Sequence, residues 1–306
     1  MTVPASLIET DLCDQVRDSC AALAEDARSV RIDPDGLERA FSEWDMDGPA
    51  AQPQTLDPEH HYLEGDRDDV AAYVLTLNAI NFGSGWFPTL RKRPGCSGYF
   101  TIASALTDRF RAEGPWSAEE LQSIHADPPS RTLGQEPGHE LVGLYAAALR
   151  GLGSFLGART PLELIEGADG SAERLAATLC RMRFFDDVGF WKRAQITAND
   201  LALGGIAEFD DLDRLTTFAD NLVPHVLRVD GVLVYDDQLA ALIDGEQPLE
   251  PGEREREIRA CAVHACELLA ERLRVPSRIL DVWLWNRGQE AHYKSRPRHR
   301  TRTVYY

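Results

Sequence analysis

Apolar residues recur at intervals of three and four along most of this 306-residue chain, and strict alternation of apolar and polar residues is nearly absent. Such intervals place side chains on one face of an α-helix. The clearest apolar stripes lie in residues 70–80, 141–155 and 258–269. Each stripe predicts a helix with one face toward a core, and together they predict an all-α fold.

Sequence signals for helix ends agree with this fold class. Ser117 with Glu120 has the spacing of a capping box, and Thr160 before Pro161 is typical of a helix start. No repeat or low-complexity segment divides the chain, so we expect a single compact domain over residues 1–306. Within it, residues 1–58 are expected to form an N-terminal helical arm packed on a core of residues 59–306. Only residues 300–306 alternate enough to predict a short C-terminal strand.

Charge limits the partners of the chain. It carries 32 Lys and Arg residues against 50 Asp and Glu residues, a formal net charge of −18. So negative a protein repels phosphate backbones and anionic membranes unless its basic residues are segregated on one face. We therefore expect no nucleic-acid partner and no membrane partner. The longest apolar run, Leu141 to Leu149, is much shorter than the roughly 18–20 residues of a membrane-spanning helix.

The cysteines and histidines favour a reduced compartment without a structural metal. Six cysteines are scattered without a CxxC pair, as is typical of small buried thiols in a cytoplasmic protein. The start of the chain contains acids and lacks a basic n-region, so we expect no secretory signal. There is no HExxH motif, and His60 and His61 have no partners at ligand intervals, so we expect no metal.

One predicted helix carries polar side chains beside aromatic ones. In residues 190–200, Lys192, Gln195 and Asn199 fall on one helical face, next to Trp191. A solvated helix face is the ordinary interpretation of such a pattern. The aromatic neighbours indicate partial burial instead, and a buried lysine needs an anion.

Asp220 is the candidate anion. It stands where the cap of a helix is expected, because Pro224 is tolerated only in a first helical turn. An ordinary capping aspartate is the common explanation of this position. A carboxylate at a helix N-terminus is also stabilised by the helix dipole, by about 0.3–1 kcal/mol. A carboxylate fixed in this way is suited to stabilising a cation.

Three further segments carry candidate binding groups. Asn81, Phe82 and Trp86 lie among glycines that allow a ligand near the backbone. Trp283 and Trp285 cannot both face the core of one helix, so one ring is expected to line a cleft. The tail has a run of cations without an acid, which can bind a phosphate or offset neighbouring acids. These cations are Lys294, Arg296, Arg298, Arg300 and Arg302.

Together these segments resemble the queuosine salvage proteins, the queuosine 5′-phosphate N-glycosylases. The resemblance runs in order from about residue 60 to the end, and its most specific blocks are Trp191 to Ile196 and Phe218 to Asp220. It implies an all-helical fold related to the helix-hairpin-helix DNA glycosylases. It also implies a hydrolase that cleaves the N-glycosidic bond of queuosine 5′-monophosphate, releasing queuine and ribose 5-phosphate, for queuine salvage toward tRNA modification. Weaker blocks are Gly98 to Phe100, Gly153 to Leu156, Arg254 to Cys261, Leu284 with Trp285, and Tyr305 with Tyr306.

The resemblance implies Asp220 as the catalytic carboxylate and Lys192 as a supporting cation. Asp220 would act as a nucleophile or would orient water as a general base, and the residues leave both roles open. Hydrolysis needs no cofactor, so none is expected. The expected partner is a small nucleotide. The further substrate-binding candidates are Asn81, Phe82, Trp86, Arg193, Asn199, Asp200, His225, Tyr235, Asp281, Trp285 and Arg302.

Two alternatives stay open at this point. A DNA-repair-type base glycosylase performs similar chemistry on a flipped base, but it needs an extended basic face. A non-catalytic queuine-nucleotide-binding protein would hold the nucleotide without releasing its base. Binding to duplex DNA with a steep salt dependence would support the first, and a bound nucleotide that stays intact would support the second.

Overall fold

The computed structural model describes residues 11–47, 56–136 and 138–306. Helices dominate this part of the chain, which confirms the expected all-α fold, and its single sheet has two short strands. No described helix combines the length and the apolar character that a membrane crossing requires. The helices are α1 (Leu12–Asp26), α2 (Pro34–Glu43), α3 (Arg67–Ala79), α4 (Gly98–Glu113), α5 (Ala118–Ser123), α6 (Asp127–Thr132), α7 (Glu140–Leu156), α8 (Pro161–Glu166), α9 (Ala172–Leu179), α10 (Lys192–Leu203), α11 (Val223–Val229), α12 (Asp237–Asp244), α13 (Glu253–Leu273), α14 (Ser277–Arg287) and α15 (Ala291–Lys294). The strands are β1 (Val30–Ile32) and β2 (Leu233–Tyr235), and the 3-10 turns are η2 (Phe87–Thr89) and η3 (Leu212–Arg214).

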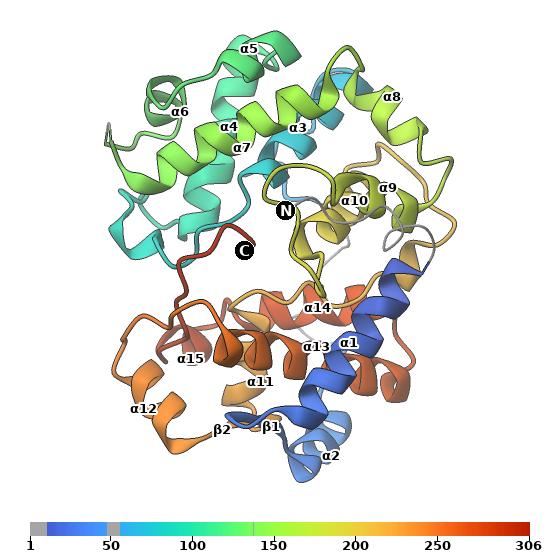
Figure 1. The fold of residues 1–306 in the computed structure, drawn as a ribbon, viewed down its shortest axis with the longest axis vertical. Helices are drawn as coiled ribbons and strands as arrows, with labels where there is room; N and C mark the ends of the chain where they lie inside the picture. Colours follow the sequence, from blue (N-terminus) through green and yellow to red (C-terminus); the bar gives the residue numbers. More distant parts are fainter. Residues whose placement is uncertain (1–10, 48–55, 137) are drawn as a thin grey trace.

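Two hydrophobic clusters build the core, and Figure 1 shows them as two lobes, one above the other. The upper lobe packs α3, α4, α7, α9 and α10 together. The lower lobe packs α11 to α14 on the small sheet. Helix α13 contributes to both, with Ala260 and Val263 in the upper cluster and Ile258 and Cys261 in the lower one. The predicted stripe over residues 258–269 is therefore the element that the two lobes share.

Segments from opposite ends of the sequence meet in the lower lobe. Helix α1 packs along α13, although its buried residues Val16 and Cys20 belong to the upper cluster. Strand β1 pairs antiparallel with β2, and Val30 lies opposite Tyr235. The N-terminal helices thus help to fix the position of the lower lobe.

The helix ends follow the sequence signals. Glu120 N–H donates to the Ser117 hydroxyl at 3.2 Å, and Ser117 N–H donates to the Glu120 carboxylate at 2.7 Å. Helix α8 begins at Pro161 after the cap residue Thr160. Both predicted helix starts are confirmed. In α7, a Cβ on Gly153 would lie 2.7 Å from a backbone nitrogen of α5, so the close packing of these two helices requires glycine there.

The predicted C-terminal strand is wrong. Residues 300–306 form no strand in the described part of the chain but run between the two lobes (Figure 1). The Tyr306 carbonyl accepts the N–H of Gly83 at 2.8 Å, and the Val304 carbonyl accepts a guanidinium N–H of Arg193 at 2.8 Å. The sequence alternation reflects the burial of Thr301 and Thr303 on either side of an exposed residue, rather than a strand ladder.

Candidate active site

A strained turn sets the start of α10. The backbone carbonyl of Asp187 accepts the N–H of Phe190 at 3.0 Å and that of Trp191 at 2.8 Å. Trp191 has a φ of 52°, in the left-handed region, which costs an L-residue roughly 1–2 kcal/mol. The turn leads directly into Lys192, the first residue of α10, whose side chain is buried. The surrounding contacts therefore hold Lys192 in place against a local backbone cost.

Asp220 lies at the start of α11. Its Oδ1 accepts the N–H of Leu222 at 2.6 Å and that of Val223 at 3.1 Å. These are N–H groups that the helix itself leaves unpaired. Leu222 rather than Asp220 is the cap residue, although the Asp220 carboxylate makes the capping contacts, and Pro224 lies in the first turn as expected. Asp220 is half-buried, unlike the fully buried Lys192.

The charges of three carboxylates act on Lys192. Burial lowers the pKa of Lys192, and the charges of Asp220, Asp281 and Asp200 oppose this lowering, in that order of strength. Lys192 and Asp200 come from α10 in the upper lobe, whereas Asp281 comes from α14 in the lower lobe (Figure 1). We call these four residues the carboxylate–lysine cluster. It lies where the two lobes meet.

Asp281 is held under the segment that leads to Asp220. Its Oδ1 accepts the N–H of Phe218 at 2.9 Å. Burial raises the pKa of Asp281 to about 8, and the charge of Asp220 adds to the rise, whereas the Phe218 N–H and Lys192 oppose it. A carboxyl with this pKa is mostly protonated at neutral pH. Burial and the charge of Asp220 therefore both favour the neutral form of Asp281.

Amide side chains link Asp200 to α3 and the segment that follows it. Asp200 Oδ2 accepts a hydrogen bond from Asn78 at 2.9 Å, and Asn78 Oδ1 accepts one from Asn81 at 3.2 Å. Burial raises the pKa of Asp200 to about 6, opposed first by the Asn78 hydrogen bond and then by the charge of Lys192. Within the described residues, the buried Asn199 Oδ1 has no hydrogen-bond partner, so it is available to a ligand.

An aromatic group borders the cluster. The ring centroid of Trp285 lies 6.1 Å from that of Tyr99 and 5.8 Å from that of Phe100. The His60 ring lies 4.4 Å from Phe100. Burial raises the pKa of Tyr99 well above its usual value, and the charge of Asp200 adds to this rise. This group offers flat apolar surface for a planar base.

Trp285 was predicted as a binding residue, whereas its ring neighbours Tyr99 and Phe100 were not, and neither was Asn78, the partner of Asp200. Tyr99 and Phe100 belong to the resembling block that begins at Gly98, and this block was the available signal for them. Asn78 lies inside a fully buried helix stripe, where an amide among apolar residues was the available signal. Trp283 is buried whereas Trp285 is half-buried, as expected for two rings that cannot share one face.

The tail and α11 contribute one basic side chain each, Arg298 and His225, and the charge of Asp220 acts on Arg298. Burial lowers the pKa of Arg298, and the charge of Asp220 opposes this lowering, so the arginine lies within electrostatic range of Asp220. His225 Nε2 lies 2.9 Å from the Tyr293 carbonyl, which makes Nε2–H the donor, and Nδ1 has no partner among the described residues. Burial lowers the pKa of His225, and Arg298 adds to this effect. A neutral His225 therefore offers an acceptor, which suits a hydroxyl better than a phosphate.

Two predicted binding residues lie inside the upper lobe. The Arg193 guanidinium donates to the backbone carbonyls of Ala79 and Val304, at 2.7 and 2.8 Å. It packs 4.8 Å from the Phe82 ring and is 1% exposed. Arg193 therefore cannot reach a phosphate in the way its sequence position suggested, and Phe82 is a core residue.

Three other predicted binding residues have partners of their own. Trp86 Nε1 and an Arg302 guanidinium N–H both donate to one carboxylate oxygen of Glu140, at 2.8 and 3.1 Å. The Tyr235 ring lies in β2, 4.9 Å from the Arg228 guanidinium. No contact among the described residues joins Trp86, Arg302 or Tyr235 to the carboxylate–lysine cluster.

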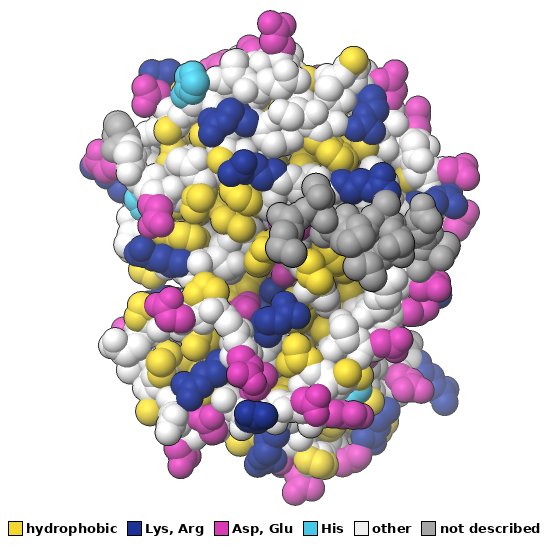
Figure 2. Space-filling model, in the orientation of Figure 1, with side chains coloured by type: hydrophobic (Ala, Val, Ile, Leu, Met, Phe, Trp, Pro, Cys, Tyr) yellow, Lys and Arg dark blue, Asp and Glu magenta, His cyan; other side chains and the backbone are white. Residues whose placement is uncertain are grey.

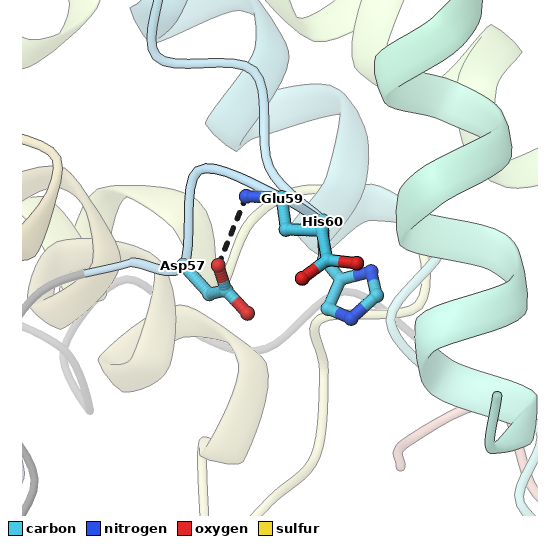
Figure 3. A group of neighbouring side chains, drawn as sticks. All are labelled: Asp57, Glu59 and His60. Atoms are coloured by element: carbon cyan, nitrogen blue, oxygen red, sulfur yellow. Dashed lines mark hydrogen bonds between the residues drawn. The ribbon is translucent and has the colours of Figure 1, made fainter. Parts of the chain in front are cut away.

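A small group of possible metal ligands lies at the edge of the aromatic group. Figure 3 shows Asp57, Glu59 and His60, whose ligand atoms all lie within 4.8 Å of one another. The expectation that His60 has no partners for a metal is therefore wrong. Asp57 and Glu59 are exposed, and His60 Nδ1 lies 2.8 Å from the Ser104 hydroxyl. Hydrated surface carboxylates are common without an ion, so we assign no metal here.

A surface hollow of about 480 Å³ lies elsewhere, between α4 and α6. Two of its arginines are paired with acids that also line it, Arg93 with Asp108 at 2.8 Å and Arg109 with Glu113 at 3.6 Å. It does not include the carboxylate–lysine cluster, where the groups suited to glycosidic chemistry converge.

Comparison with known proteins identifies the family of this chain. Residues 60–306 match the family described as queuosine salvage protein. A Sphaerobacter thermophilus protein named queuosine 5′-phosphate N-glycosylase/hydrolase is 32% identical over 313 residues, covering 93% of this chain and 95% of that protein. A Mus musculus protein of the same name is 27% identical over 341 residues, covering 95% of this chain and 98% of that protein. The chain therefore belongs to the queuosine salvage protein family.

Proposed function

We propose that this protein hydrolyses the N-glycosidic bond of queuosine 5′-monophosphate, releasing queuine and ribose 5-phosphate. The observation that carries the proposal is the position of Asp220, a half-buried carboxylate that two backbone N–H groups hold and whose charge acts on both Lys192 and Asp281. The names of the relatives support the same reaction for this chain.

Asp220 supplies the negative charge that the reaction needs. As the bond between C1′ and the base nitrogen breaks, positive charge develops at C1′ and the ring oxygen, and a fixed carboxylate stabilises it. Asp220 either bonds to C1′ and is then displaced by water, or removes a proton from water as the water oxygen bonds to C1′. The overall balance is the same in both routes: the bond between C1′ and the base nitrogen breaks, water supplies the hydroxyl on C1′, and the released base gains one proton.

The groups around Asp220 match the separate parts of the substrate in charge and shape: the phosphate, the planar base, the cationic amine and the ribose. Lys192 and Arg298 are the cations for the phosphate dianion, because both lie within electrostatic range of Asp220. Trp285 and its ring neighbours form the surface for the planar base. Asp200 carries a negative charge above its pKa of about 6, so it suits the cationic amine of the substrate. His225 Nδ1 suits a ribose hydroxyl.

The whole chain acts as one catalytic unit in this proposal, because both lobes supply groups to the cluster. The six cysteines are free, which fits a reduced cytoplasmic location. A nucleic-acid substrate is disfavoured by the net charge of −18, and on the face drawn in Figure 2 basic side chains are interspersed with acidic ones. No cofactor enters the reaction.

Incubation with queuosine 5′-monophosphate, followed by chromatography for free queuine, tests the proposal. Stoichiometric release of queuine and ribose 5-phosphate is expected. An intact nucleotide that elutes with the protein would identify a carrier instead. Release of a base from duplex DNA would identify a DNA-repair-type glycosylase.

Comparison of the monophosphate with the free nucleoside tests the phosphate site. The monophosphate is expected to have the higher kcat/KM, chiefly through a lower KM, because Lys192 and Arg298 bind the phosphate in the ground state as well as in the transition state. Equal kcat/KM values for the two substrates would remove the phosphate site from the proposal.

A further inference from the structure

A buried ion pair lies behind the carboxylate–lysine cluster. Arg259 on α13 donates from both terminal nitrogens to the two carboxylate oxygens of Asp187, at 2.9 and 2.6 Å. Arg259 is 1% exposed and Asp187 is 3% exposed, so neither reaches a ligand. The guanidinium is held between the Phe190 ring, at 3.9 Å, and the Tyr306 ring, at 4.8 Å. Glu255 Oε1 also lies 3.6 Å from a terminal nitrogen of Arg259, so two rings and two carboxylates restrict the position of the guanidinium.

Each partner of this pair also holds the backbone next to a catalytic side chain. Arg259 Nε donates to the carbonyl of Ala219 at 3.1 Å, the residue directly before Asp220. Asp187 accepts the N–H of Lys192 at 3.4 Å through a carboxylate oxygen, and its backbone carbonyl accepts the N–H of Trp191 at 2.8 Å. One rigid unit thus connects the peptide that carries Asp220 with the peptide that carries Lys192.

A buried ion pair is weak evidence for stability, because apolar residues of similar volume often stabilise a fold as well or better. The planar guanidinium fixes direction as well as charge, since its donors point along set axes in one plane. Here all three used nitrogens have acceptors. The arrangement therefore defines distances and angles that an apolar pair could not define.

We propose that Asp187 and Arg259 are positioning residues that set the separation and orientation of Asp220 relative to Lys192. The inference rests on the proposed function, since it assigns the pair a role in that reaction. The pair acts through the two backbone segments and touches no substrate. Its loss should therefore lower turnover much more than it lowers substrate affinity.

Arg259→Lys is the primary test, because lysine keeps the cation for Asp187 but cannot also donate to Ala219 with the same geometry. A displacement of about 1 Å at a catalytic group costs about 100-fold in rate, so kcat for queuine release should fall by about 100-fold. KM should stay within about threefold of the wild-type value. Arg109→Lys is the matched control, because Arg109 also stacks on a ring, 4.0 Å from Trp116, and its side chain is 10% exposed. The control should lose thermal stability without this loss of kcat.

Tyr306→Leu keeps the test decisive if Arg259→Lys does not fold. It removes the ring that lies 4.8 Å from the guanidinium, together with the hydroxyl that contacts His299 and Glu255, whereas Asp187 and the Ala219 carbonyl stay as acceptors. A smaller fall in kcat, about tenfold, is therefore expected. Unchanged kcat in a folded Arg259→Lys variant, or in Tyr306→Leu where only that variant folds, would overturn the inference. Equal losses in kcat for Arg259→Lys and Arg109→Lys would also overturn it, because both would then follow from stability alone. Failure of the proposed function is distinct, since the wild-type protein itself would then release no queuine.

Discussion

Asp281→Asn tests the protonation state that the site requires. Asp281 has a pKa of about 8, raised by burial and by Asp220, so the wild-type carboxyl is neutral at pH 7 and ionises as the pH passes 8. Ionisation places a second negative charge beside Asp220, in a site that must admit a phosphate dianion. An asparagine stays neutral at every pH, and its Oδ1 can still accept the Phe218 N–H that Asp281 accepts at 2.9 Å.

The size of the effect follows from the pKa. One pH unit above a pKa of about 8, only about a tenth of the carboxyl groups stay protonated. At pH 9 the wild-type kcat/KM should therefore be about tenfold below its value at pH 7, mainly because KM rises. The Asn variant should show no such decline between these two pH values.

The assay is steady-state release of queuine from queuosine 5′-monophosphate between pH 6 and about pH 9.5, for the wild-type and Asp281→Asn proteins. The free nucleoside is the matched substrate control, because it has no phosphate to repel and should show a weaker decline. The same alkaline decline in both proteins would refute the assignment to Asp281, as would a wild-type profile that is flat through pH 9.

The ionisation of Asp281 should also lower the stability of the folded wild-type protein as the pH rises. A raised folded-state pKa contributes stability that is fully present below the pKa of an unfolded aspartate, about 3.9, and is lost as the pH rises to about 8. The Asn variant lacks this loss. Its melting temperature relative to wild type should therefore rise between pH 5 and pH 8, as thermal unfolding would measure. A difference that does not change with pH would contradict this expectation.

Lys192→Met should lower kcat/KM for the monophosphate by at least about 30-fold, because it leaves buried carboxylates without their cation. The loss for the free nucleoside should be smaller. Equal losses for the two substrates would show that Lys192 does not bind the phosphate. Trp285→Ala should weaken binding of the monophosphate by about 10-fold or more, since stacking on one base contributes about 1–3 kcal/mol. Calorimetry in an Asp220→Asn background would measure this loss, and Trp283→Ala, which removes a buried ring, is the control for general destabilisation.

The periodic pattern of the sequence predicted the helices well, because burial of an apolar stripe is a local property of the chain. It also placed Asp220 at a helix N-terminus through Pro224. The C-terminal strand was predicted wrongly because Thr301 and Thr303 are buried between the two lobes. Alternating burial of this kind gives the same sequence pattern as a strand in a sheet.

The site was predicted only in part, because its groups come from distant segments. Lys192 and Asp281 are far apart in the sequence, and only the packing of α10 and α14 makes them neighbours. Arg193 was predicted as a substrate-binding residue because the sequence does not distinguish an arginine that donates to buried backbone carbonyls from one that binds a phosphate. The role of Arg259 depends on a contact with Ala219 that no spacing in the sequence indicates.

The central claim is that the Asp220 carboxylate carries the chemistry, and Asp220→Asn tests it most directly. Asparagine keeps an oxygen for the N–H groups of Leu222 and Val223, so the variant should fold and bind queuosine 5′-monophosphate. Under single-turnover conditions the rate of queuine release should fall by about 10²–10⁴-fold, with calorimetric affinity nearly unchanged. A variant that binds the nucleotide and retains more than about a tenth of the wild-type rate would contradict the account.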